Sequence, residues 1–155
     1  MLWRRLVSFS AICLLAGALA SGQGMRPDAN GVIRISPDDL RWPTSSTMQS
    51  IVVAGDPTKP GIYVIRNHFP AGQMSKPHFH DKDRFVTVIK GTWYVSLGPD
   101  SDKYEPAKMQ AMKAGSFVFH PAFGHHYDMA KDEEAVVRII GMGPVKSTNL
   151  EEPKR

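Results

Sequence analysis

The stretch GQMSKPHFHDKDRFVTVIKG, residues 72–91, carries the pattern on which the expected fold depends. At its centre, His78 and His80 are separated by one residue. Side chains alternate along a β-strand with a period of two, so in a strand both imidazoles face one side and Phe79 faces the other. Two imidazole nitrogens on one face can share a divalent ion. Taken alone, a His-x-His pair also fits incidental surface polarity, so the metal interpretation requires a second motif.

That second motif is GSFVFHPAFGHHYD, residues 115–128. It reads as a glycine turn, a short buried strand and a proline at the end of the strand. His125 and His126 follow the turn. Neighbouring residues of a strand face opposite ways, so only one of these two histidines can point into a barrel. The other is expected to be exposed or to bond to the backbone.

The rest of the chain alternates short apolar segments with turns rich in Gly, Pro and Asp. Segments rich in Val, Ile, Tyr, Phe and Trp predict strands at 32–35, 49–54, 62–69, 85–90, 92–97, 108–113, 117–120, 126–130 and 135–141. No segment of eleven or more residues shows a convincing helical stripe. Residues 36–40 are expected to form one helical turn, capped by Ser36. Many short strands at this spacing indicate an all-β sandwich or barrel.

Taken together, the two motifs resemble those of the cupin superfamily. The first cupin motif runs Gly, five residues, His-x-His, three or four residues, Glu, six residues, Gly. This chain has Gly72, five residues, the pair His78 and His80, three residues, Arg84, six residues and Gly91. The match therefore fails only at the glutamate, where this chain carries an arginine.

The second cupin motif runs Gly, five residues, Pro-x-Gly, two residues, His. Gly115 and Pro121 fit it, His126 falls five positions after Pro121, and Gly124 is one position late. The resemblance spans residues 72–128 and implies a single cupin barrel over residues 32–148, a double-stranded β-helix or jelly roll. It further implies a divalent ion, whether iron, zinc, manganese, nickel or copper, with the metal ligands His78, His80 and His126.

Arg84 stands where cupins usually carry a metal-binding glutamate. A guanidinium stays protonated and has no lone pair, so it cannot replace that ligand. Neutral imidazole ligands leave the charge of the ion uncompensated and favour an anionic ligand. If Arg84 faces inward, it is a candidate anion-binding residue that can grip a carboxylate bidentately. If it does not, it faces outward or pairs with Asp83 or Asp128.

Other residues of possible chemical interest receive structural interpretations. His68 and His120 lie outside the ligand positions and are expected to be structural or exposed. Carboxylates at Asp81, Asp83 and Asp128 are at the wrong spacing for the usual metal geometry. Four aromatic residues are expected to pack in the barrel core rather than to hold a substrate: Tyr63, Trp93, Tyr94 and Phe119. Thioethers are soft copper ligands, yet Met74, Met109, Met112 and Met129 are expected to fill gaps.

The first twenty residues have the pattern of a secretory signal peptide. Arg4 and Arg5 precede an apolar run from residue 6 to residue 20, which ends in a small-x-small pattern at residues 18–20. The run is short for a membrane span, which takes about 20 apolar residues, although a retained anchor is the alternative. The prediction is an exported protein, periplasmic or extracellular, with a signal peptide at 1–20, a flexible leader at 21–31, no membrane association after cleavage and a disordered tail at 149–155.

Cleavage would leave a chain with little net charge and no cysteine. Removing Arg4 and Arg5 from 19 basic residues leaves 17 against 15 acidic ones, a net charge of +2, and the single cysteine, Cys13, is also removed. So small an excess of scattered basic residues argues against nucleic acid as a partner. Without disulfides, stability must come from a packed core, with help from a metal or a second subunit. Because unpaired edge strands favour association, a homodimer is expected.

Two functions follow from these observations. The first is a metal-dependent enzyme that acts on a small organic molecule, either anionic or oxygen-chelating. Iron or copper would support dioxygenase-like chemistry, and zinc, manganese or nickel would support isomerase, decarboxylase or lyase chemistry. The second is a non-catalytic exported protein that binds or senses a small ligand or a metal. The sequence identifies no distinct general base, so the catalytic residues stay open.

Overall fold

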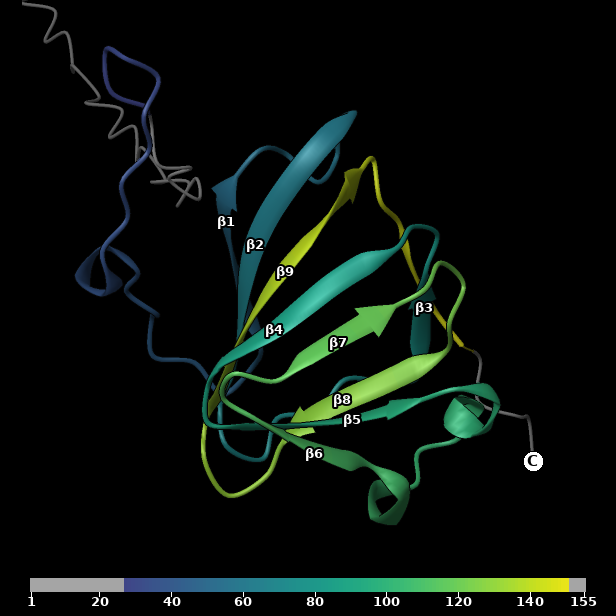
Figure 1. The fold of residues 1–155 in the computed structure, drawn as a ribbon. Coiled ribbons are helices and arrows are strands. Elements are labelled where there is room, and N and C mark those ends of the chain that lie inside the picture. The colour runs from purple at the N-terminus through teal and green to yellow at the C-terminus, as the bar shows by residue number, and fades with distance from the viewer. Residues whose placement is uncertain (1–26, 151–155) are drawn as a thin grey trace, which may run out of the picture.

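The computed structural model describes residues 27–150, and within them ten strands form two antiparallel five-stranded sheets (Figure 1). The all-β fold class is therefore confirmed. In chain order the strands are β1 (Gln49–Ala54), β2 (Gly61–Phe69), β3 (His78–His80), β4 (Arg84–Lys90), β5 (Thr92–Leu97), β6 (Gln110–Lys113), β7 (Phe117–His120), β8 (His126–Ala130), β9 (Ala135–Gly143) and β10 (Ser147–Asn149). Three short 3-10 turns complete the elements: η1 (Pro37–Asp39), η2 (Pro99–Asp102) and η3 (Pro106–Lys108).

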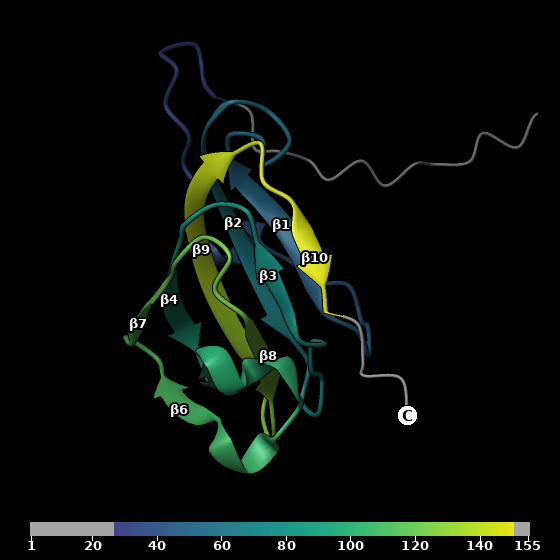
Figure 2. The same cartoon turned by 90° about the vertical axis from the view of Figure 1, so that its right-hand side faces the viewer.

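The two sheets interleave distant parts of the sequence. One sheet has the order β1-β2-β9-β4-β7, and the other has the order β10-β3-β8-β5-β6 (Figure 2). Between them lies a core of apolar side chains, among which Tyr63, Trp93, Val86, Val95 and Val137 are at most 1 % exposed. In Figure 2, β1, β3 and β10 lie toward the upper right, away from β6 and β7 at the lower left.

Alternation along the strands explains why these sequences form the barrel. On β4, Val86 and Val88 are each 1 % exposed, whereas Phe85 and Ile89, which flank them, are 45 % and 39 % exposed. The tight turn that follows β4 needs a glycine. Gly91 has a φ of +69°, and a Cβ built on it would lie 2.0 Å from the backbone oxygen of Glu134. The glycine that ends the first motif is thus required by the close approach of β9.

Most of the expected strands are confirmed. Those at 49–54, 92–97, 117–120 and 126–130 have the bounds expected, and those at 62–69, 85–90 and 135–141 are extended by one or two residues. The strand expected at 108–113 begins only at Gln110, because η3 takes the preceding residues. The helical turn expected at 36–40 is present as η1.

The strand expected at 32–35 is wrong. The carboxylate of Asp28 instead accepts hydrogen bonds from the backbone N–H groups of Asn30 and Val32, at 2.9 and 3.0 Å, and from Arg34, at 2.6 Å. Side-chain bonds of this kind compete with pairing in a sheet.

Conversely, β10 was not expected, and it carries the barrel past the boundary predicted at residue 148. Leu150 continues the pairing, because its N–H donates to the carbonyl of Pro77 at 2.9 Å. The predicted signal peptide, most of the predicted leader and residues 151–155 of the predicted tail lie outside the described residues.

Candidate metal centre and its pocket

Strands β3 and β8 bring the three expected ligands together. His78 and His80 share one face of β3, and His78 pairs directly with His126 of β8. The ring centroid of His78 lies 4.2 Å from that of His126 and 5.0 Å from that of His80. One nitrogen of each imidazole lies within 4.8 Å of the others. Divalent ions bind nitrogen at about 2.0–2.1 Å, so three nitrogens at this spacing can surround one ion.

Backbone carbonyls fix which nitrogen of each ring faces the centre. Nδ1 of His78 donates to the carbonyl of Lys76 at 2.7 Å, and Nδ1 of His126 donates to the carbonyl of Gly124 at 2.9 Å. A ring that donates through Nδ1 keeps its lone pair on Nε2, which is the arrangement that metal-binding histidines use. Nε2 of His80 is buried without a partner among the described residues. The three imidazoles therefore fit a divalent ion, and the unpartnered Nε2 of His80 supports this fit.

Burial keeps two of these imidazoles, those of His80 and His126, neutral, as a metal ligand must be. It lowers the pKa of His80 to about 3, with a further contribution from the charge of Arg84. It also lowers the pKa of His126, where His120 and His78 add to the effect. Protons therefore do not compete for these nitrogens near neutral pH.

Arg84 faces into the barrel, so the outward orientation considered above is wrong. It lies on β4, in the sheet opposite the histidines, and is 7 % exposed. Its Nη2 lies 3.5 Å from Nε2 of His126, the outer limit of a hydrogen bond. Burial lowers its pKa, an effect that the charge of Asp128 opposes. Among residues 27–150, no carboxylate forms an ion pair with Arg84, so the expected alternative of a pair with Asp83 or Asp128 is also wrong.

Asp128 is a site residue that spacing alone did not single out. It shares the inward face of β8 with His126 and is buried, and burial raises its pKa. Its Oδ1 has no hydrogen-bond partner among the described residues, and its side chain lines the pocket. It is absent from the group of atoms that surround the metal position, as its spacing predicted. The alternation of His126 and Asp128 along one strand was the sequence pattern that could have identified it.

The other histidines have the structural surroundings expected of them. His120 is 2 % exposed; its ring lies 4.2 Å from that of His126, and it also stacks on Trp93. His125 points away from the barrel and pairs with Asp102, so His126 alone of the adjacent pair faces inward.

The partners of His68 lie outside the metal centre. It stacks on Trp42 with ring centroids 5.1 Å apart and bonds to Glu134 at 2.7 Å.

The expected aromatic core is confirmed in part. Tyr63 and Trp93 are each 1 % exposed and belong to the core. Tyr94 instead lies under Lys131, whose Nζ is 4.0 Å from the ring centroid. Phe119 is 44 % exposed, so its placement in the core is wrong. It lies on β7, a strand at the edge of its sheet. The neighbouring His120 points into the barrel, so Phe119 points outward.

The expected roles of the methionines are confirmed only in part. Met112 packs against the core, as a gap-filling residue would, whereas Met74 is 44 % exposed. Among the described residues, none of the groups that could hold a metal ion includes a methionine.

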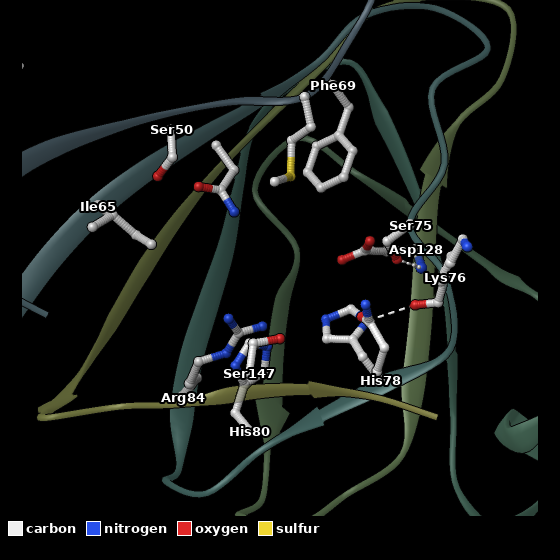
Figure 3. Close-up of a pocket in the computed structure, with 13 residues that line it drawn as sticks. Ser50, Ile65, Phe69, Ser75, Lys76, His78, His80, Arg84, Asp128 and Ser147 are labelled. Carbon is white, nitrogen blue, oxygen red and sulfur yellow. Dashed lines mark hydrogen bonds between the residues drawn. The ribbon is translucent and has the colours of Figure 1, made fainter. Parts of the chain in front are cut away.

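A pocket of about 350 Å³ opens in front of the histidines (Figure 3). One side is polar and carries His78, His80, Arg84 and Asp128. The other side is formed by β2 and the residues around β1, and presents Met48, Ile65 and Phe69. The volume is near the lower end of the ~300–1,000 Å³ of small-molecule sites. The arrangement can therefore hold a small molecule with one end against the metal position.

Comparison with known proteins supports the fold. No family model matches the sequence, and no curated protein matches it. Among solved structures, an uncharacterised protein with a double-stranded β-helix domain from Klebsiella pneumoniae is 20% identical, with a TM-score of 0.61 over 77% of this chain and 97% of that one. A cupin-like protein from Thermotoga maritima is 18% identical, with a TM-score of 0.53 over 68% of this chain and 79% of that one.

A third similar structure is an enzyme. The polyketide cyclase RemF from Streptomyces resistomycificus is 17% identical to this chain, with a TM-score of 0.56 over 78% of this chain and 88% of that one. Identities this low establish the fold and leave the chemistry to the residues of the site. The barrel topology and these structural neighbours agree, and the chain has a double-stranded β-helix fold like that of the cupin-like protein.

Proposed function

We propose that this protein is a metal-dependent enzyme that acts on a small organic molecule in the cupin pocket. The observation that carries the proposal is the convergence of three imidazoles, His78, His80 and His126, with the unpartnered buried Nε2 of His80 among them. The similarity of the fold to that of a polyketide cyclase supports an enzymatic role for a barrel of this kind.

The residues of the pocket divide the work that such an enzyme requires. His78, His80 and His126 would hold the ion, which supplies Lewis acidity, or oxygen chemistry if it is iron or copper. Arg84 provides positive charge for an anionic group of the substrate. Asp128 lines the same pocket, and because burial raises its pKa, its Oδ1 is suited to hold a proton and transfer it. The apolar wall excludes water from one side of the substrate.

Export is part of the proposal and depends on the first twenty residues. Their basic start, apolar run and small-x-small end fit a cleaved signal peptide. No helix within residues 27–150 is long and apolar enough to cross a membrane. The exported form would begin at Ser21.

A second candidate function is a binding protein without catalysis. It is favoured by the position of Arg84, whose Nη2 lies 3.5 Å from the Nε2 atom of His126 that a metal would use. A guanidinium that donates to this lone pair competes with the ion for it. In that case the histidines and Arg84 would together bind a small anion.

Metal content of the exported protein separates the two candidates. We expect close to one equivalent of iron, copper, zinc, manganese or nickel in the wild-type chain, and background metal in a variant with His78, His80 and His126 replaced by alanine. His125→Ala, at the residue that precedes β8 and whose side chain pairs with Asp102, is the matched control and should retain the metal. The intact mass of the same sample tests cleavage before Ser21. Metal at background in the wild type, even after incubation with divalent ions, would favour the binding protein.

A further inference from the structure

Arg84 is a buried cation that forms no ion pair with a carboxylate among the described residues. It is 7 % exposed, and no carboxylate within residues 27–150 forms an ion pair with it. Its Nε is buried and unpartnered among the described residues, and its Nη2 lies 3.5 Å from Nε2 of His126. Buried charges in proteins are as a rule paired, because an unpaired one is strongly destabilising. Asp128 acts on Arg84 from the same pocket without forming an ion pair with it, so the guanidinium retains donors for an anionic ligand.

The place of that anion is defined by its surroundings. The guanidinium enters the pocket from β4, and His78 and His80 approach from β3 on the other sheet (Figure 3). An anion held by Arg84 would thus lie beside the position where the three imidazoles would hold an ion. A carboxylate has two oxygens that can accept parallel bonds from a guanidinium or divide between a guanidinium and a metal.

The far side of the pocket has the opposite character. Ile65 and Phe69 project from β2 on the wall away from the histidines (Figure 3), and Met48 completes this wall. On this same face of β2, between Ile65 and Phe69, the Oδ1 atom of Asn67 is buried without a partner among the described residues. The pocket is therefore amphipathic: it is charged on the side of the histidines, and its β2 side is mainly apolar with one hydrogen-bond acceptor, that of Asn67.

From these features we propose that the ligand is a small amphipathic carboxylate, with its carboxylate on Arg84 and a short carbon chain or ring against Met48, Ile65 and Phe69. The inference rests on the proposed function for the ion beside the carboxylate, whereas its contact with Arg84 needs no ion. A sugar acid fits poorly, because several of its hydroxyl groups would lose hydrogen bonds to water against the apolar wall.

Calorimetric titration tests this class directly. Hexanoate, acetate, hexanamide and galacturonate are titrated into the metal-free protein and into the zinc-loaded protein. We expect hexanoate to bind both forms, and to bind the zinc form more tightly. Acetate lacks the chain, hexanamide lacks the charge, and galacturonate lacks the apolar end, so each should bind at least about 10-fold more weakly.

Variants identify the residues responsible. Arg84→Gln should weaken hexanoate by about 10- to 100-fold, as loss of a charged hydrogen-bond donor does. Ile65→Ser should weaken hexanoate but not acetate. Arg138→Gln, an exposed arginine of β9, is the matched control and should change neither. Thermal unfolding of each variant confirms that it is folded.

The outcomes separate this inference from the proposed function. Equal binding of hexanamide, undiminished binding by a folded Arg84→Gln variant, or tighter binding of galacturonate would each overturn the carboxylate assignment. Failure of the wild type to take up zinc would instead overturn the metal-dependent function. Hexanoate binding that Arg84→Gln abolishes would then still support the assignment of the ligand.

Discussion

Three histidines of the barrel, His80, His120 and His126, are buried as neutral rings, and this affects stability in acid. Burial lowers the pKa of His80 and of His120 to about 3, and it also lowers the pKa of His126. In an unfolded chain an imidazole has a pKa of about 6.5, so below that pH the unfolded state binds protons that the folded state does not. The free energy of unfolding must therefore fall as the pH falls from about 6.5 towards 3.

The predicted slope is up to about 1.4 kcal/mol per pH unit for each of the three histidines in the metal-free protein. Asp128 opposes this loss of stability in acid. Its raised pKa means that, as the pH falls, the folded state takes up a proton at this carboxyl before the unfolded state does. Urea unfolding at pH 7, 6 and 5 with a chelator present measures the slope. His120→Gln, which leaves the three expected ligands in place, should reduce it by roughly one histidine's share. An unchanged slope in this variant would mean that His120 is protonated in the folded state.

The positions of the three candidate metal ligands could be predicted from the sequence, but the inward direction of Arg84 could not. His78 and His80 alternate along a strand, and the motif spacing places His126, so these three follow from local pattern. The direction of Arg84 depends on the register of β4 against β9 and β7, where Arg84 lies opposite Gly141 and His120. That register is a non-local property of the sheet, and spacing within the motif does not contain it. Asp128 differs, because its alternation with His126 along one strand is local and could have indicated its inward direction.

Among the elements, β3 is the one on which the metal centre depends most. It has three residues, and its only register partner on β8 is the pair between His78 and His126. On its other side it is held by β10, which pairs Ser147 with His80 and Asn149 with His78. Asp81 extends the contact, because its Oδ1 accepts from the N–H of Lys146 at 2.7 Å. The geometry of two ligands thus depends on a short edge strand.

Breaking β10 should weaken the metal site without removing a ligand. Thr148 pairs with Phe79 in the middle of the two strands, and Thr148→Pro removes its N–H from the ladder. We expect metal affinity to fall by about 10-fold or more, as it does when groups that orient metal ligands are lost. Thr148→Ala keeps the N–H and is the control. Competition with a zinc-binding dye measures both affinities, and equal affinities would show that β3 keeps its geometry without β10.

The same element shows where sequence patterns become uninformative. All three residues of β10 are exposed: Ser147, Thr148 and Asn149. The strand therefore has no buried face and no alternation of apolar residues from which it could be predicted. The segment at 32–35 shows the opposite error. Its apolar residues predicted a strand, but Val32 and Ile33 are 43 % and 39 % exposed, so they bury too little apolar surface to form one. Whether a segment pairs at the edge of a sheet depends on the neighbouring strand, and a single sequence does not reveal that neighbour.

For the whole molecule, the barrel was predictable because its period-two pattern repeats over most of its length. What the pattern left open is the surface. Phe85, Phe117 and Phe119 are 45 %, 59 % and 44 % exposed on neighbouring strands β4 and β7. They were assigned to strands correctly, but which face of an outer strand meets solvent depends on what covers it. The expected homodimer stays a prediction.

The stability of the whole molecule should depend on the ion. The only cysteine of the chain, Cys13, lies within the predicted signal peptide, so the exported form would have no disulfide. An ion held by His78, His80 and His126 would join β3 to β8, which otherwise share a single pair. A ligand that binds only the folded state at about 100 times its dissociation constant adds roughly 2.7 kcal/mol to the free energy of unfolding.

For a domain of this size that corresponds to a rise of roughly 10 °C in Tm. Thermal unfolding of the metal-free protein, with and without zinc in excess, measures the rise. The variant with His78, His80 and His126 replaced by alanine should show none, because zinc then has no site that folding creates. His125→Ala should rise like the wild type. A rise of equal size in the triple variant would place the stabilising ion elsewhere, and no rise in the wild type would mean that the barrel is complete without a metal and that its three imidazoles serve the bound anion instead.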